Sequence, residues 1–286
     1  MINKEETQQL SRGRSLPRII KMSAKPYVPA ESLSKLWRAL IEFDMLSEGD
    51  KILIGLSGGK DSMFLTAALA EAQKYSPIKF ELACYTVDGM FSPNFPEKEL
   101  QAFCADYGLT HYHEKVNVME AWQNKGNTPC FTCAYFRRAA TNRRAKELGF
   151  NKIALAHHHD DAVETFLMNI LTSGQLRSFL PVTKLSRSGM TVLRPLLYYR
   201  ESEVIAAGKA IGLQPLKNPC PYDGHTKRQE IKEHIEALAA ISPEVYDHLT
   251  AAMRNASNQE LWPEQLAQKA MVKKFHEFWQ KKGKKE

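Results

Sequence analysis

A six-residue segment combines groups that could bind a phosphate chain: Ser57, Gly58, Gly59, Lys60, Asp61 and Ser62. The two glycines allow the backbone to approach an anion closely, and a helix that starts after them would offer free N–H groups. The lysine adds a positive charge, and the serines add hydroxyl donors. The aspartate would repel a phosphate unless a divalent cation lay between them, which predicts Mg²⁺. Ile54 stands where a Walker A loop has its first glycine, so this is a different kind of phosphate loop.

A second segment joins histidines to carboxylates, in the order His157, His158, His159, Asp160 and Asp161. The composition suggests a transition-metal site. However, successive side chains of an extended segment point to opposite faces, so the three imidazoles cannot all converge. Asp160 could be explained simply as the N-cap of a helix. The functional alternative is that Asp160 or Asp161, or both, bind the Mg²⁺ predicted for the phosphate loop.

The five cysteines are an odd number and do not make a disulfide framework. Cys84 and Cys104 lie among apolar neighbours and are expected to be small core residues. Cys130 and Cys133 form a Cys-x-x-Cys pair at the opening of a predicted helix, and Cys220 lies in a loop rich in proline and glycine.

Three cysteines outside the predicted core could serve several purposes. The Cys-x-x-Cys pair could be a redox dithiol, half of a zinc site or two thiols with no special task. With Cys220, the pair could bind zinc, for which His225 is a candidate fourth ligand. The same three thiolates could instead hold an iron–sulfur cluster with one iron left open. The residues alone leave these alternatives open.

Strand and helix patterns alternate through the part of the chain that must position these residues. Short apolar runs predict strands over residues 51–56, 80–87, 111–116, 152–156 and 192–194. Helical periodicity predicts helices over residues 61–75, 97–107, 133–148 and 160–171. An earlier helix begins at Ser32, with an apolar stripe at Leu33, Leu36, Trp37, Leu40 and Ile41. This alternation indicates an α/β fold with a parallel sheet flanked by helices, in which ligands bind at the carboxyl ends of the strands.

These patterns divide the chain into three parts. Residues 1–30 lack sustained periodicity and contain prolines, which predicts a basic flexible arm. Residues 31–225 form the α/β domain. Residues 226–286 read as helical only, with segments starting near residues 226, 243 and 263 and a basic tail. The α/β domain therefore carries helical extensions at both ends.

The composition is that of a globular protein rather than a membrane-bound or disordered one. The 286 residues are 43% hydrophobic and 25% charged. No run approaches the roughly 18 apolar residues of a membrane helix, and the acidic opening residues do not form a secretory signal, so we expect a cytoplasmic protein. The net charge of +7 is concentrated in residues 1–30 and 269–286, which fits contact with a polyanion such as RNA.

The order Ser-Gly-Gly-x-Asp-Ser resembles the PP-loop of the ATP pyrophosphatases, which split ATP into AMP and pyrophosphate to activate a carbonyl oxygen. The resemblance implies an adenine nucleotide alpha hydrolase-like fold in which this loop holds the β- and γ-phosphates, with catalytic roles for Lys60 and Asp61. It also implies that the strand end near Val87 contacts adenine through its backbone. In the second segment, His157 and Asp161 match the superfamily's pattern, which implies that they bind ATP. Asp61 of the loop, with Asp160 and Asp161 of the second segment, are the candidate Mg²⁺ ligands.

One branch of this superfamily matches more of the chain, over roughly residues 33–235. The sequence resembles the tRNA 2-thiocytidine synthetase (TtcA-type) family at Cys130, Cys133, Arg137, Arg138, Arg194, Arg200, Glu201, Cys220, Arg228 and Gln229. The resemblance implies a 4Fe-4S cluster on Cys130, Cys133 and Cys220, with the fourth iron open to bind the transferred sulfur. Ala139 departs from the glycine that commonly follows the arginine pair.

The resemblance implies an ATP-dependent, tRNA-thiolating transferase. AMP would be transferred to O2 of a pyrimidine, with cytidine 32 of tRNA as the family's target, while Lys60 and Mg²⁺ spread the charge of the leaving pyrophosphate. Sulfur would then attack C2 and expel AMP, with Cys220 among the catalytic residues. The implied partners are tRNA and a sulfur donor such as a cysteine desulfurase, and the family also suggests a homodimer.

Other activities fit the same loop. The chain could be a 2-thiouridine synthetase or a sulfurtransferase that acts on a small molecule. If the cysteines bind zinc, it could be a zinc-containing PP-loop tRNA ligase. A non-catalytic ATP-binding protein is a further alternative.

Overall fold

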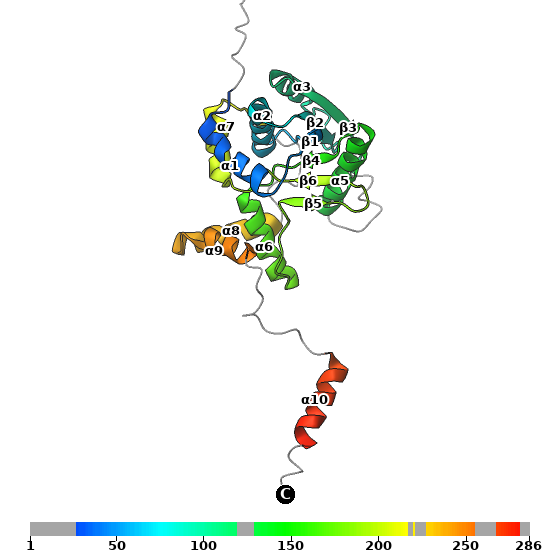
Figure 1. Cartoon of the computed structure of the whole chain (residues 1–286), viewed down its shortest axis with the longest axis vertical. Helices are drawn as coiled ribbons and strands as arrows, with labels where there is room; N and C mark the ends of the chain where they lie inside the picture. The colour runs from blue at the N-terminus through cyan, green and yellow to red at the C-terminus, as the bar shows by residue number, and fades with distance from the viewer. Residues whose placement is uncertain (1–26, 119–128, 217–219, 221–226, 255–266, 281–286) are drawn as a thin grey trace, which may run out of the picture.

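A six-stranded sheet in the order β3-β2-β1-β4-β6-β5 organises the molecule (Figure 1). The structure is a computed structural model, and it describes residues 27–118, 129–216, 220, 227–254 and 267–280. The strands are β1 (Asp50–Gly55), β2 (Phe80–Asp88), β3 (Thr110–Lys115), β4 (Lys152–Ala154), β5 (Val182–Lys184) and β6 (Thr191–Leu193). The first four and β6 pair in parallel, which confirms the predicted α/β class. Strand β5 was not predicted. It has three residues, pairs antiparallel to β6 and is the outermost strand on that side of the sheet.

Nine described helices surround or extend this sheet. They are α1 (Ala30–Glu42), α2 (Lys60–Tyr75), α3 (Glu97–Asp106), α5 (Pro129–Glu147), α6 (His159–Ser173), α7 (Glu201–Ala210), α8 (Lys227–Ile241), α9 (Val245–Arg254) and α10 (Gln268–Gln280). Helix α7 was missed by the sequence analysis. Helix α5 begins at Pro129 rather than near Cys133, so it takes in the whole Cys-x-x-Cys motif. Proline suits a first helical position because its fixed φ is already helical. The predicted arm at residues 1–30 lies almost wholly outside the described residues.

The two faces of the sheet bury different helices. Strand side chains alternate between faces, so Ile52 and Ile54 of β1 join one core with α1, α2, α3 and α7, while Leu53 joins a second core with α5 (Figure 1). Cys84 is fully buried in the first core together with Cys104 of α3, as predicted. Because a buried core packs on each face of the sheet, the ends of the strands are held in place from both sides.

The predicted apolar stripe of α1 is correct at most positions and wrong at one. Leu33, Leu36 and Leu40 are buried, and Trp37 packs against the same core. Ile41 instead has 71% of its surface exposed. The buried face of α1 is therefore narrower than the predicted stripe.

Helices α8 and α9 pack on α6. Val163 of α6, Ile231 and Ile235 of α8, and Tyr246 of α9 make a third buried cluster. This packing brings α8 beside the carboxyl edge of the sheet, where α6 begins. Among the described helices, none has the length and apolar character needed to cross a membrane.

Candidate functional site

The phosphate loop lies directly after β1 and leads into α2, as predicted. Gly58 has a φ of +83°, the left-handed conformation that glycine adopts without strain. A Cβ at this position would lie 3.4 Å from the side chain of Leu100. Gly59 is the N-cap residue of α2 and has no side chain that could occupy the first-turn N–H groups. The hydroxyl oxygens of Ser57 and Ser62 lie 3.1 Å apart at the same helix start. The loop thus offers backbone and hydroxyl donors to an anion.

Lys60 is held between two carboxylates. Its Nζ lies 3.1 Å from Oδ2 of Asp61 and 2.9 Å from Oε1 of Glu201, the first residue of α7. Burial acts to lower the pKa of Lys60, but the two carboxylates outweigh it and raise the pKa. The lysine is therefore fully charged at neutral pH and already directed at the loop.

Glu201 links the loop to α8. Its second oxygen, Oε2, lies 2.5 Å from Nζ of Lys232. Burial acts to raise the pKa of Glu201, but hydrogen bonds from Lys232 and Lys60 outweigh it and lower the pKa to about 2. Two ammonium groups from different helices thus share one carboxylate beside the phosphate loop.

The second segment meets the phosphate loop through His158. Nε2 of His158 lies 4.0 Å from Oδ1 of Asp61 and 3.5 Å from Oδ2 of Asp161. Oδ1 of Asp61 is buried and has no hydrogen-bond partner among the described residues. An unpaired buried carboxylate oxygen is costly, and a bound cation would remove that cost. In the described part of the chain, no three His, Cys, Asp or Glu residues form a ready-made metal cluster.

The three neighbouring histidines point to different surroundings, as the alternation of an extended segment predicts. The ring of His157 packs against Phe179, with 5.0 Å between centroids. His158 faces Asp61, and Nε2 of His159 lies 2.7 Å from Oγ1 of Thr250 on α9. Burial lowers the pKa of His157 to about 4, so this imidazole is neutral at physiological pH.

The N-cap of α6 is His158 rather than Asp160, which corrects the simpler interpretation of that aspartate. Nδ1 of His158 accepts from the backbone N–H of Asp161, and the Asp161 side chain accepts from the backbone N–H of His158. Asp160 instead accepts from Nε of Arg200 at 3.0 Å and from the backbone N–H of Glu201 at 2.8 Å. It therefore fastens α6 to the start of α7.

Helix α8 brings a cation to the other aspartate. Nη1 of Arg228 lies 2.6 Å from Oδ1 of Asp161, and Nη2 donates to Oγ1 of Thr165 at 3.0 Å. Glu164 lies behind this pair, 3.7 Å from Nη1 of Arg228. Burial, with the nearby charge of Asp161, raises the pKa of Glu164 to about 7. A carboxyl that titrates near neutral pH thus lies one turn into α6.

Four charged residues of this network were given no role in the site by the sequence analysis. Glu201 and Arg228 were noted only as matches to the family, and Glu164 and Lys232 were not singled out. Two spacings could have indicated three of them, but not Glu201. Arg228 and Lys232 are four residues apart on α8, and Asp161 and Glu164 are three apart on α6, so each pair shares a helix face. The sequence could not indicate that these faces meet.

The end of β2 extends beyond the last residue of β1 that pairs with it. The pairing of β1 with β2 ends at Gly55 and Tyr85, whereas β2 continues to Asp88. The carbonyl of Tyr85 accepts from Leu56 on the β1 side. Because backbone groups of a strand alternate in direction, those of Val87 point to the same side, past the end of β1. A cavity of about 510 Å³ adjoins this strand end, with Asp88 in its wall.

The three candidate cluster cysteines are described to different extents. Cys133 on α5 and Cys220 are both partly exposed, in contrast to the fully buried Cys84 and Cys104. The side chain of Cys130 lies outside the described part of the chain, as does most of the segment around Cys220. Partial exposure is compatible with thiols that bind a cofactor to which a substrate has access.

Comparisons with known proteins show which family has a similar sequence. A family model described as a PP-loop domain matches residues 30–238. A tRNA-cytidine(32) 2-sulfurtransferase from Alcanivorax borkumensis is 34% identical over 229 residues, which are 78% of this chain and 80% of that protein. The enzyme of the same name from Cupriavidus metallidurans is 33% identical over 222 residues, covering 76% of this chain and 70% of the relative.

A solved structure has the same fold. It is the U34-tRNA thiolase NcsA from Methanococcus maripaludis, with its 4Fe-4S cluster. The TM-score is 0.63 at 21% sequence identity, and the match covers 85% of this chain and 86% of that one.

Proposed function

The chain belongs to the PP-loop domain family, and we propose that it is an ATP-dependent tRNA sulfurtransferase that replaces the C2 oxygen of cytidine 32 with sulfur. The observation that carries the proposal is the similarity to tRNA-cytidine(32) 2-sulfurtransferases over more than three quarters of the chain. The phosphate loop and its charged neighbours supply the groups that such a reaction requires.

ATP would bind across the carboxyl ends of β1 and β2. The loop from Ser57 to Ser62 would surround the β- and γ-phosphates through first-turn N–H groups of α2, hydroxyls and Lys60. The backbone of Val87, which extends beyond β1, would contact adenine. Lys60 would exchange its carboxylate partners for phosphate oxygens and spread the charge of the leaving pyrophosphate.

Mg²⁺ would be held chiefly by Asp61. Its buried Oδ1, which has no hydrogen-bond partner in the described structure, fits a cation ligand. Both oxygens of Asp160 are already occupied by Arg200 and Glu201, so Asp160 fits a fastening role better. Asp161 could join Asp61 only if Arg228 moved away from its oxygen.

Cys130, Cys133 and Cys220 would hold a 4Fe-4S cluster. The partial exposure of Cys133 and Cys220 fits thiolates that bind such a group. When bound, the cluster supplies an iron at which the sulfur atom is delivered. The sulfur itself would come from a donor protein such as a cysteine desulfurase.

The residues of this chain would act on the oxygen that must leave. O2 of the cytosine attacks the α-phosphorus of ATP, the bond to pyrophosphate breaks, and an adenylated base results. A C–S bond then forms at C2 and the C–O bond breaks, with AMP as the leaving group. Lys60 and the N–H groups of α2 stabilise the charge that develops on pyrophosphate, which is where electrostatic preorganisation contributes most.

The decisive experiment is a nucleoside analysis of tRNA from a strain that lacks the gene. We expect loss of 2-thiocytidine alone, restored by the wild-type gene but not by Cys220→Ser. The Cys220→Ser protein should still bind ATP, because the thiol and the phosphate loop are separate groups. Loss of 2-thiouridine instead would move the target to uridine. An unchanged profile, in an organism that makes 2-thiocytidine, would refute tRNA thiolation.

A further inference from the structure

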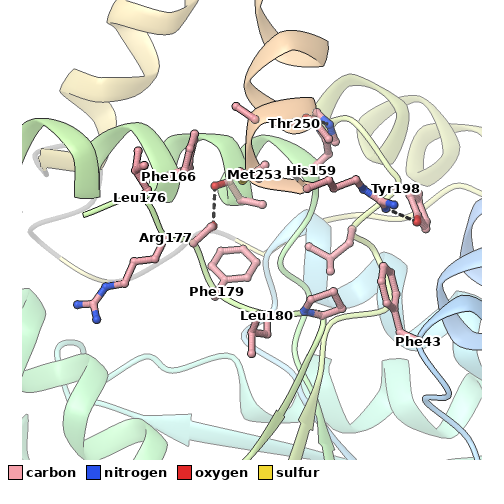
Figure 2. A pocket seen from close by; sticks show the side chains of 16 residues that line it. Phe43, His159, Phe166, Leu176, Arg177, Phe179, Leu180, Tyr198, Thr250 and Met253 are labelled. Carbon is pink, nitrogen blue, oxygen red and sulfur yellow. Dashed lines mark hydrogen bonds between the residues drawn. The ribbon is translucent and has the colours of Figure 1, made fainter. Parts of the chain in front are cut away.

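A large pocket lies beside the phosphate-loop site and has no part in the chemistry described above. Its volume is about 700 Å³, and we call it the aromatic pocket (Figure 2). The residues that characterise it are Phe43, His159, Arg177, Phe179, Tyr198 and Arg254. In Figure 2, Phe179 lies on one side of the pocket, and Phe43 and Tyr198 lie on the other.

The aromatic pocket and the phosphate loop share one edge of the sheet. Tyr198 follows β6, and His159 follows β4, so both come after the carboxyl ends of parallel strands. Phe179 precedes β5, which is antiparallel and therefore begins at the same edge. Ligands of open parallel sheets bind along this edge. The pocket thus extends the candidate active site from β4 towards β6 and β5.

The two sites are adjacent through the three-histidine segment. His158 contacts Asp61 of the phosphate loop, whereas His159, the next residue, lines the pocket. His157 packs against Phe179, a wall of the pocket. A single RNA substrate could therefore contact both the phosphate loop and the pocket.

Arginines stand against the rings of the pocket. The guanidinium of Arg194 lies 4.9 Å from the ring centre of Phe179, and that of Arg38 lies 4.2 Å from the ring centre of Tyr198. Arg254 lies 5.5 Å from the ring centre of Tyr198. Arg177 is exposed and points outward from the pocket (Figure 2). Flat rings combined with arginines match the way proteins bind unstacked bases and their phosphates.

The charge of this region favours an anion. Glu42 pairs with Arg38 and Arg254 and so neutralises part of their charge. Arg194 instead donates to the carbonyl of Leu180 and to a threonine hydroxyl, both neutral groups, and keeps its positive charge. The pocket is apolar inside and positive around its walls and rim, which is complementary to a base attached to a phosphate backbone.

We propose that the aromatic pocket binds an unstacked base of the RNA substrate, next to the nucleotide that reacts at the phosphate loop. The base stacks on Phe179, and Arg177 contacts a flanking phosphate. This inference rests on the proposed function, because it assumes an RNA substrate, and it adds a second nucleotide-binding position to that site.

The test uses Phe179→Leu in the full-length protein purified without oxygen. Leucine keeps apolar packing against His157 but removes the aromatic face. We expect the Kd for unmodified tRNA transcripts bearing cytidine 32 to rise about tenfold, in the range measured for loss of one base–aromatic stack, with ATP affinity unchanged. Tyr75→Ala is the matched control, since Tyr75 is an exposed aromatic residue at the far end of α2.

Crosslinking locates the base directly. Transcripts carrying 5-bromouridine at one anticodon-loop position at a time should crosslink to the peptide that contains Phe179 at a position other than the thiolated one. Phe179→Leu should abolish that crosslink, and Phe43→Leu should weaken tRNA binding in the same direction.

Three results would overturn the proposal. The first is unchanged tRNA affinity in Phe179→Leu and Phe43→Leu. The second is crosslinking confined to other peptides. The third is a change in sedimentation behaviour without a change in tRNA affinity, because the pocket would then be a protein interface. Failure of the proposed function is separate, since wild-type protein would then neither bind nor thiolate the transcripts.

Discussion

Two different regions lie at the carboxyl ends of the strands, on either side of His158. One is a network of ion pairs around the phosphate loop, and the other is the aromatic pocket. In the first region, Lys60, Glu201 and Lys232 form a chain of salt bridges around the phosphate loop. In the second, Phe179 and Tyr198 face a cavity of about 700 Å³. The two regions are joined by adjacent residues at the start of α6.

The difference between these regions matches the two tasks proposed above for the carboxyl ends of the strands. A polyphosphate requires fixed positive charge, and Lys60, which is held between two carboxylates, would supply it under the proposed function. A base requires a flat apolar wall, and charge matters there only at the rim. Substitutions in the ion-pair network should therefore alter catalysis and pH dependence, whereas substitutions in the pocket should alter RNA affinity.

The largest effect is expected at Lys60. Lys60→Ala should lower the rate of tRNA-dependent pyrophosphate release by about 10²–10³-fold, because it removes a preorganised charge from the leaving group. The release of pyrophosphate from ATP measures this directly. Lys51→Ala is the control, since Lys51 pairs with Glu81 on the surface at the other end of β1. If wild type and Lys60→Ala released pyrophosphate at equal rates, Lys60 would have no role in the reaction.

The next effect concerns Glu164, whose pKa is raised to about 7. A raised carboxyl pKa favours the folded state below the ordinary pKa near 4.5, and this stability is lost as pH rises through 7. Glu164→Gln should therefore match wild type at pH 4.5 and exceed its unfolding free energy at pH 8 by on the order of 3 kcal/mol. Urea unfolding at both pH values checks this. A difference between the proteins that did not change with pH would contradict it.

Glu201→Gln should have a smaller, opposite effect. Removing the charge shared by Lys60 and Lys232 should lower the unfolding free energy by about 1–2 kcal/mol at pH 7. Because the pKa of Glu201 is lowered to about 2, its contribution is present above pH 4.5 and is lost as pH falls towards 2. Glu42 pairs with Arg38 and Arg254 beside the pocket and is more exposed than Glu201. Glu42→Gln should therefore lower the unfolding free energy, measured by urea unfolding at pH 7, by less than Glu201→Gln does. An equal loss in both variants would remove the distinction between the two regions.

The smallest effect is expected at the pocket rim. Arg177→Ala should weaken tRNA binding a few-fold and reduce the slope of log Kd against log salt by about one, as for loss of one phosphate contact. Titrations at several salt concentrations measure the slope. Arg187→Ala is the matched control. Arg187 is also exposed, but it lies in the turn between β5 and β6, at the end of the sheet opposite to the carboxyl ends of the parallel strands. A slope reduced equally by both variants would indicate general charge attraction only.

Much of the fold followed from local patterns. The apolar runs of β1 and β2 and the glycines after β1 were sufficient to place a strand, a phosphate loop and a helix start within one or two residues. Strand β5 and helix α7 were missed, because β5 (Val182–Lys184) contains a single apolar residue and α7 carries a mixed pattern of charged and small residues. Ile41 was assigned to the core because periodicity cannot tell how wide a contact face is.

The sequence by itself determined the phosphate loop and its position at the end of β1, since a loop of six adjacent residues needs only local backbone conformation. It also determined that the three histidines diverge. Only the tertiary structure decided that Lys60 shares Glu201 with Lys232, that Asp160 binds Arg200 and Glu201 at the start of α7, and that α8 packs beside the loop. The aromatic pocket depends on the same kind of information. Its walls come from α1, α6, α9 and the segments beside β5 and β6, and side chains so distant in sequence meet only when the packing of buried helices brings them together.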